Sequence, residues 1–346
     1  MQRFPLTAQA VYSELLSALL DEERDPWGVG GTLVRLEVKG RGYWYHQTRA
    51  GGRVHKRMLG PDSEAMRREA VGIREKLEAS RGRAKARRSL VRQLRAAGFP
   101  ALDPVSGKVL AALQVAGAFR MPTVLVGTQA FRSYPGMLGV RLPEAAAVTS
   151  DIDLAQGMAV SLGVPHGARI RPDLEALLRG VDPRFEPVPG FERPPVPTRW
   201  SLAGEDLSVE LLTPNTGPER SAPVALPALG AHATPLRFLD FLLQDAEPAA
   251  LLRETGVLVR VPSPGRYALH KLLVAQRRRG ADRSKRAKDL AQAEALLSVL
   301  IQDQPEETLD QWMELLARGT KWRKLAVASL ARLEPAVRTF FEGNAS

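Results

Sequence analysis

The chain has 346 residues, a hydrophobic fraction of 44% and no cysteine. This length suits two or three domains with real cores, and the missing cysteines exclude disulfides, thiolate zinc sites and a cysteine nucleophile. The net charge is +11, and residues 1–100 carry most of it, with 20 Lys and Arg against 11 Asp and Glu. That excess favours a polyanionic partner such as RNA or DNA, although a solvated basic surface explains it equally well. With no signal peptide and no long apolar run, we expect a cytoplasmic protein without membrane contact.

The N-terminal segment predicts a helix, a small antiparallel sheet and a second, long helix. Apolar residues at helical spacing indicate the first helix at Thr7–Glu23. Alternating and β-branched residues separated by glycine turns predict three strands at Thr32–Val38, Gly42–Gln47 and Val54–Leu59. Ser63 is the expected N-cap of the long helix, which starts near Glu64. Tyr43 and Tyr45 must face away from Trp44 and His46, and the pattern leaves open which pair faces outward.

A strongly basic segment follows at residues 81–95, with seven Lys or Arg and no acidic residue. It is compatible with a helix that leads into the next domain. Such a helix can lie on a phosphate backbone, and a solvated helical face is an equal alternative.

The next segment predicts a phosphate-binding turn. A helix at Lys108–Ala118 and a buried strand at Pro122–Val126 lead into Gly127, Thr128 and Gln129, which open a further helix. Glycine lets the backbone approach a phosphate closely, and exposed N–H groups at a helix start favour anions. An ordinary strand-to-helix turn is the alternative. Residues 132–150 are expected to form a loop.

Three acidic residues in strand-like segments are candidate metal ligands. Asp151 and Asp153 lie in a strand expected at Ser150–Leu154, and Glu210 lies in one expected at Leu207–Leu212. Side chains alternate along a strand, so Asp151 and Asp153 share a face at a spacing of about 7 Å. If the two strands are neighbours, the three carboxylates can hold two Mg²⁺ or Mn²⁺ ions about 3.5–4 Å apart. A chance Asp-x-Asp and a solvent-facing Glu are the alternatives.

The remaining segments predict short strands and then a helical module. The expected elements are a helix at Pro172–Leu178, a proline-rich surface or edge segment at 181–199, a hairpin of Arg199–Ala203 with Leu207–Leu212, a helix at Pro235–Leu243, a strand at Gly256–Val261, and helices at Arg266–Arg279, Lys285–Leu300, Pro305–Ala317 and Lys321–Phe341.

The order of these motifs resembles the DNA polymerase beta-like nucleotidyltransferase superfamily. The resemblance rests on VGTQAF at 126–131, TSDIDLA at 149–155 and VELLTP at 209–214. It is closer to a bacterial family of nucleotidyltransferase-fold proteins, to which YPGMLGVRL at 134–142, the N-terminal GYWYHQ at 42–47 and LGPDS at 59–63 are also similar. It implies a mixed-sheet core, Mg²⁺ and an NTP substrate. Thr128 replaces the usual Ser or Gly of the phosphate turn, Glu210 replaces the usual third Asp, and the spacing from Thr128 to Asp151 is longer than usual.

RYALHKLLVAQRR at 266–278 and KRAKDLAQAEALL at 285–297 are also similar to this bacterial family. The helical module further resembles that of nucleotidyltransferase toxins of abortive-infection systems, through Lys271 and the pair Lys288-Asp289. The resemblance implies that Lys271 neutralises triphosphate charge. It also implies that Asp289, in the pair Lys288-Asp289, orients Lys271 or contacts the nucleotide. The alternatives are a helix lysine that extends to solvent and a surface or capping Asp.

These observations together predict an α+β protein. We expect a basic N-terminal three-stranded antiparallel sheet with helices (1–95), a mixed-sheet nucleotidyltransferase core (96–235) and a C-terminal helical domain that completes the site (236–346). The expected activity is metal-dependent transfer of NMP from an NTP, such as ATP, to a hydroxyl, with an RNA 3′ end as the candidate acceptor. RNA, with tRNA as one candidate, and an antitoxin are the expected macromolecular partners. Nucleotidylation of a protein or small molecule, and a catalytically inactive nucleic-acid-binding module, are the alternatives.

Overall fold

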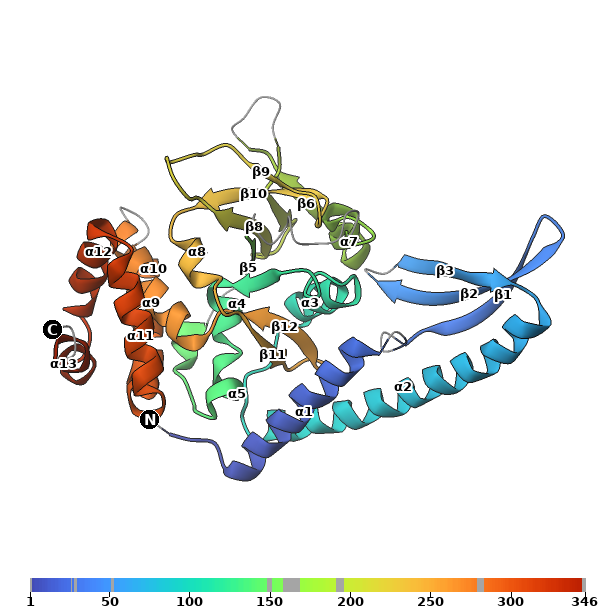
Figure 1. Ribbon diagram of the computed structural model, residues 1–346, viewed down its shortest axis with the longest axis horizontal. Helices are drawn as coiled ribbons and strands as arrows, with labels where there is room; N and C mark the ends of the chain where they lie inside the picture. The colour runs from blue at the N-terminus through green and yellow to red at the C-terminus, as the bar shows by residue number, and fades with distance from the viewer. Residues whose placement is uncertain are drawn as a thin grey trace.

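The computed structural model describes residues 2–25, 27, 30–50, 53–147, 151–157, 169–190, 196–278 and 283–343. As the sequence predicts, the described residues form a small antiparallel sheet, a central mixed sheet and a set of C-terminal helices (Figure 1). The class is α+β. None of the described helices combines the length and the apolar character that a membrane crossing requires.

The N-terminal elements form an arm that projects from the body of the molecule (Figure 1). They are α1 (Leu6–Arg24), β1 (Thr32–Val38), β2 (Arg41–Ala50), β3 (Arg53–Pro61) and α2 (Glu64–Ala96). The three strands pair in the predicted antiparallel order. Ser63 caps α2 as predicted, because its side chain accepts a hydrogen bond from the Met66 N–H at 3.1 Å. The basic segment 81–95 continues α2 without a break.

The central sheet has the strand order β4-β5-β8-β10-β9. Its strands are β4 (Thr123–Val126), β5 (Ile152–Gln156), β8 (Ser208–Pro214), β9 (Val224–Leu226) and β10 (Ala231–Leu236). β5 and β10 run parallel to β8, whereas β4 and β9 run antiparallel to their neighbours. β7 (Arg199–Leu202) forms the predicted hairpin with the first half of β8, and β6 (Phe185–Val188) pairs with β7. The proline-rich segment thus runs along a sheet edge, and its residues 191–195 lie outside the described part.

The helices pack around this sheet and share its hydrophobic core. The remaining elements are α3 (Pro104–Val115), α4 (Gly127–Phe131), α5 (Tyr134–Leu138), the 3₁₀ helix η1 (Glu144–Ala147), α7 (Leu174–Val181), α8 (Leu239–Leu242), the hairpin β11 (Glu247–Leu251) and β12 (Val257–Val261), α9 (Pro264–Arg277), α10 (Arg283–Asp303), α11 (Pro305–Ala317), α12 (Thr320–Leu330) and α13 (Pro335–Gly343). One cluster of buried apolar residues extends from Leu102 to Phe341, so the central sheet and the C-terminal helices bury their apolar faces against each other. The domain division at residues 95 and 235 stays a prediction.

Three predicted segments differ from the structure. Residues 132–147 contain α5 and η1 rather than only loop, because Pro135 fits the first turn of α5 and Gly139 ends it at φ 65°. The last part of the expected loop, residues 148–150, lies outside the described residues. Residues 235–243 begin as the end of β10, and α8 follows only after Phe238, which has φ 72°. The helix expected at 321–341 is two helices, α12 and α13, because the second begins at Pro335.

Candidate active site

Asp153 and Glu210 lie side by side on adjacent parallel strands. β5 pairs with β8 so that Asp153 is opposite Glu210 and Ile152 is opposite Val209. Because strand side chains alternate, the two acids share one face, while Ile152 and Val209 are fully buried on the other. Asp151 lies just before β5, two residues from Asp153. The structure therefore places Asp153 beside Glu210, with Asp151 just before the same strand.

The side chains of Ser208 and Arg199 contact Asp151. Ser208 donates a 2.6 Å hydrogen bond to Asp151 Oδ1, and Arg199 Nη2 lies 3.5 Å from the same oxygen. Arg199 is also opposite Glu210 in the register of β7 and β8. The sheet thus carries a row of charged groups across three strands, with Arg199 at one end and Asp153 at the other.

The electrostatics of this row show carboxylates that repel one another. Burial, together with the charges of Glu210 and Asp151, raises the pKa of Asp153 to about 7, against the opposing effects of Lys271 and Arg199. Burial also raises the pKa of Glu210, and the Arg199 charge works in the other direction. Such a site gains stability from any further positive charge that enters it.

The glycine turn lies directly against Asp153. Gly127 has φ +64°, and a Cβ at this position would come within 2.0 Å of Asp153 Oδ2. Glycine is therefore required both for the backbone conformation and for the close approach. The helix that follows, α4, has only five residues. The turn itself, rather than a long helix dipole, is what this segment offers to an anion.

Two buried side chains from the C-terminal helices hold this turn in place. The Tyr267 hydroxyl lies 2.9 Å from both the Gly127 carbonyl oxygen and Gln292 Oε1, and its single proton can be donated to either acceptor. Gln292 Nε2 donates to the Ala146 carbonyl at 2.6 Å and, at 3.4 Å, to Thr128 Oγ1. The Gln129 side chain is buried, and its Nε2 donates to Ser106 Oγ at 3.4 Å. Only the backbone of Gln129 therefore lies at the glycine turn.

Lys271 and Asp289 form a buried ion pair on the facing helices α9 and α10. Lys271 Nζ donates to Asp289 Oδ1 at 2.7 Å, and Arg278 Nε donates to Asp289 Oδ2 at 3.1 Å. Lys271 is therefore not a helix lysine that extends to solvent. Lys288 is close enough to Asp151 and Asp289 for both charges to affect its pKa, which burial and Lys271 lower. The charge of Lys285 likewise acts on Glu210.

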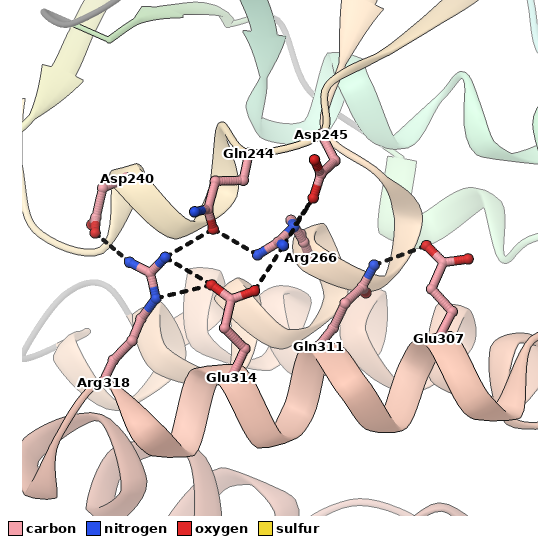
Figure 2. Close-up of polar contacts among 8 residues, drawn as sticks. All are labelled: Asp240, Gln244, Asp245, Arg266, Glu307, Gln311, Glu314 and Arg318. Carbon is pink, nitrogen blue, oxygen red and sulfur yellow. Dashed lines mark hydrogen bonds and ion pairs between the residues drawn. The ribbon is translucent and has the colours of Figure 1, made fainter.

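A polar network fixes the first turn of α9, which carries Tyr267 and Lys271 into the site (Figure 2). Arg266 is buried and donates to Asp245 at 2.9 Å and to Glu314 at 2.8 Å. Arg318 bonds the same Glu314 at 2.8 Å and also pairs with Asp240. The network joins α8, α9 and α11, and so fixes the position of α9 relative to these two helices.

The chemistry of the donor set fits a divalent cation. Within the described ranges, no group of three or more Asp, Glu or His side chains is arranged so that it could hold a metal ion. Asp153 and Glu210 nevertheless offer hard carboxylate oxygens in register, and Asp151 lies two residues before Asp153. Oxygen donors of this kind suit Mg²⁺, and the mutual repulsion at Asp153 is what a cation relieves.

Several residues of the site do not stand out in the sequence. The sequence predicts Arg199 only as the start of a strand, yet the predicted hairpin with the strand of Glu210 already places Arg199 beside that acid. Tyr267 precedes Lys271 by four residues and Gln292 follows Asp289 by three, so each shares a helix face with a predicted site residue. Ser208 carries no signal of its own.

A mixed sheet with paired acids, an adjacent glycine turn and converging cations is the arrangement expected of a nucleotidyl transfer enzyme. A family model described as nucleotidyltransferase matches residues 105–317. The match covers more than half of the chain, and the protein belongs to this nucleotidyltransferase family. No curated protein and no solved structure matches the chain.

Proposed function

We propose that this protein is a Mg²⁺- or Mn²⁺-dependent enzyme that transfers NMP from an NTP to an acceptor hydroxyl. The observation that carries the proposal is the register of Asp153 with Glu210, next to the Gly127 turn and facing Lys271. In the reaction, the acceptor oxygen bonds to the α-phosphorus, the bond from that phosphorus to the bridging oxygen breaks, and pyrophosphate leaves with the electron pair. The hydroxyl proton passes to water.

The acids and the cations have separate roles in this proposal. Asp151, Asp153 and Glu210 would hold the metal, which when bound neutralises phosphate charge and lowers the pKa of the acceptor hydroxyl. Lys271 and Lys288 neutralise triphosphate charge as compact ammonium groups. The backbone at Gly127 and Thr128 binds a phosphate oxygen.

The second layer of the site positions these groups. Tyr267 and Gln292 keep the glycine turn in the conformation that approaches Asp153. Asp289 fixes the direction of Lys271. A misplacement of about 1 Å in such a site costs about 100-fold in rate, so these buried contacts matter for transfer as well as for folding.

RNA is the acceptor that the charge distribution favours. The basic excess of residues 1–100 and the basic stretch 260–289 suit a polyanion. A tRNA acceptor is one form of this proposal. An antitoxin partner and a role in defence rest on the resemblance, and a cytoplasmic location rests on the expected lack of a signal peptide; all three belong to the same proposal.

Each labelled NTP, incubated with the protein, Mg²⁺ and either total RNA or total protein, tests the proposal. We expect label in the RNA pool, at its 3′ ends. Label in protein or in small molecules would support NMP transfer but would show that RNA is not the acceptor. No transfer to any pool, with RNA binding retained, would favour a catalytically inactive binding module.

Matched substitutions test the acids. Asp151→Asn and Asp153→Asn should each abolish transfer without unfolding the protein, as circular dichroism checks. Asp206→Asn, an exposed acid in the turn between β7 and β8, is the control and should retain full activity. Full activity of Asp153→Asn would refute the assignment of the site.

A further inference from the structure

The arm carries a sheet face that, among the described residues, meets the body only at its Arg49 end, beside α7. The opposite face buries Trp44 and His46, and Trp44 packs with Met66, Ala70, Ile73 and Leu77 of α2. Alternation along β2 therefore directs Tyr43 and Tyr45 to the open face. This answers which aromatic pair faces outward. Met58, opposite Tyr45, is 60% exposed, which shows that solvent reaches this side.

The open face combines aromatic rings with positive charge. Its side chains, read from the strand register, are Thr32, Val34, Leu36 and Val38 of β1, Arg41, Tyr43, Tyr45, Gln47 and Arg49 of β2, and Val54, Lys56, Met58 and Pro61 of β3. Three of these residues are basic and exposed, and none is acidic. Two acidic residues in or next to these strands are not on the open face. Glu37 is on the covered face, and Asp62 forms ion pairs with Arg35 and Arg67.

The positive character continues at the end of the arm that meets the body. Arg49 lines a recess whose walls include Lys108 of α3 and Arg253. The carboxylate in this recess, Glu254, is paired with Arg253 at 3.4 Å. Arg49 belongs to both the face and the recess, so the two adjoin at this end of β2. In Figure 1 the β1–β3 sheet lies on the side of the molecule away from α9–α13.

We propose that the open face of the β1–β3 sheet binds single-stranded RNA, with successive bases stacked on Tyr43 and Tyr45 and phosphates bound by Arg41, Lys56 and Arg49. Stacking is possible only for bases that are not paired, so a duplex does not fit. Thr32 and Gln47 lie opposite each other beside the tyrosines, and their hydroxyl and amide groups can bond to a ribose 2′-hydroxyl. The proposal goes beyond the transfer reaction, because this surface is not part of the site that holds the acids.

Fluorescence anisotropy with a 5′-labelled 12-nucleotide oligouridylate tests the proposal, using the full chain without NTP or metal. The double variant Tyr43→Ala/Tyr45→Ala should bind at least about tenfold more weakly, whereas Tyr43→Phe/Tyr45→Phe should bind as the wild type does, because the rings remain. A hairpin duplex and the DNA oligomer of the same length should bind more weakly than the RNA.

The salt dependence separates the basic residues of this face from basic residues elsewhere. Lys56→Ala should reduce the slope of log affinity against log salt by about 0.7. Arg68→Ala, an exposed basic residue of α2, is the matched control and should leave both affinity and slope unchanged. Equal binding by the wild type and the double Ala variant would overturn the proposal and leave the face to a protein partner. Equal affinity for the DNA oligomer would overturn the choice of RNA.

The two proposals fail in different ways. RNA binding is measured without NTP, so it should persist in Asp153→Asn, which has lost transfer. Loss of transfer with normal RNA binding would bear only on the proposed role of the acids in transfer. Loss of RNA binding in the double variant Tyr43→Ala/Tyr45→Ala would bear only on the proposed RNA-binding face of the arm. The tyrosines are half-buried surface residues, and an unchanged unfolding curve for their variants confirms that the fold is intact.

Discussion

Replacement of Gly127 by alanine should damage the site far more than an ordinary glycine substitution damages a turn. The new Cβ would lie 2.0 Å from Asp153 Oδ2, which is far inside contact distance. Either the carboxylate must rotate away from Glu210, or the turn must move away from Asp153. Both movements break the arrangement on which nucleotidyl transfer depends.

The magnitude has two parts, and a second glycine separates them. At φ +64°, any residue with a Cβ loses about 1–2 kcal/mol because the left-handed region is unfavourable for it. The steric overlap adds about 1–3 kcal/mol, as overpacking of a filled site does. Gly204 has φ +80° and no atom within 4 Å of its Cβ position, so Gly204→Ala has the first cost without the second.

Urea unfolding and the labelled-NTP assay measure the two effects on both variants. We expect Gly127→Ala to be the less stable variant by about 1–3 kcal/mol and to lose at least about 100-fold in transfer rate. Gly204→Ala should transfer NMP at the wild-type rate. Equal stability losses together with equal transfer rates would show that the contact between Gly127 and Asp153 has no functional meaning.

Three further predictions concern the helices that close the site. Asp289→Leu leaves the Lys271 ammonium buried without its carboxylate and should lower the free energy of unfolding in urea by about 3–5 kcal/mol. The double variant Asp289→Leu/Lys271→Met should recover most of this stability but should not recover transfer. Recovery of transfer in the double variant would show that the ion pair is purely structural. Burial, helped by Lys271 and opposed by Asp289, lowers the pKa of His270 to about 3 from 6.5. At this histidine the folded chain thus binds fewer protons than the unfolded chain. The free energy of unfolding should therefore rise from about pH 3 to about pH 6.5, by up to about 1.4 kcal/mol per pH unit, and then level off. If His270→Phe showed the same dependence of unfolding free energy on pH as the wild type, the result would contradict this prediction. Gln292→Leu removes the hydrogen bonds to Thr128 and Tyr267 and should weaken NTP binding, measured by calorimetry. Tyr267→Phe retains the hydrogen bond between Gln292 and Thr128 and should weaken NTP binding less. A larger loss of NTP affinity in Tyr267→Phe than in Gln292→Leu would refute the role of Gln292.

Much of the fold is predictable because the signals for its elements are local. Ser63 follows a strand and precedes an apolar helical pattern, so the start of α2 can be read from the sequence alone. The errors have non-local causes. α5 exists because Tyr134 is buried with its hydroxyl donating to the Pro262 carbonyl, 128 residues away. β10 exists because β8 and β9 flank it, and no pattern within 231–236 indicates those neighbours.

The candidate site divides in the same way. Asp153 and Glu210 can be predicted because each lies in a strand-like segment, and only their register needed the structure. Gln292 could not be predicted, since a glutamine in a helix is usually solvated. Its importance comes from full burial between Thr128, Ala146 and Tyr267, which come from three distant parts of the chain.

The helix α2 also sets a length scale for the molecule. Its 33 residues, at 1.5 Å each, make a rod about 50 Å long. One end carries the arm sheet, and the other packs through Leu90, Val91 and Leu94 against α1, so the rod cannot swing freely. The arm sheet is therefore held at a fixed place relative to the body, and its open face is a rigid surface rather than a mobile one.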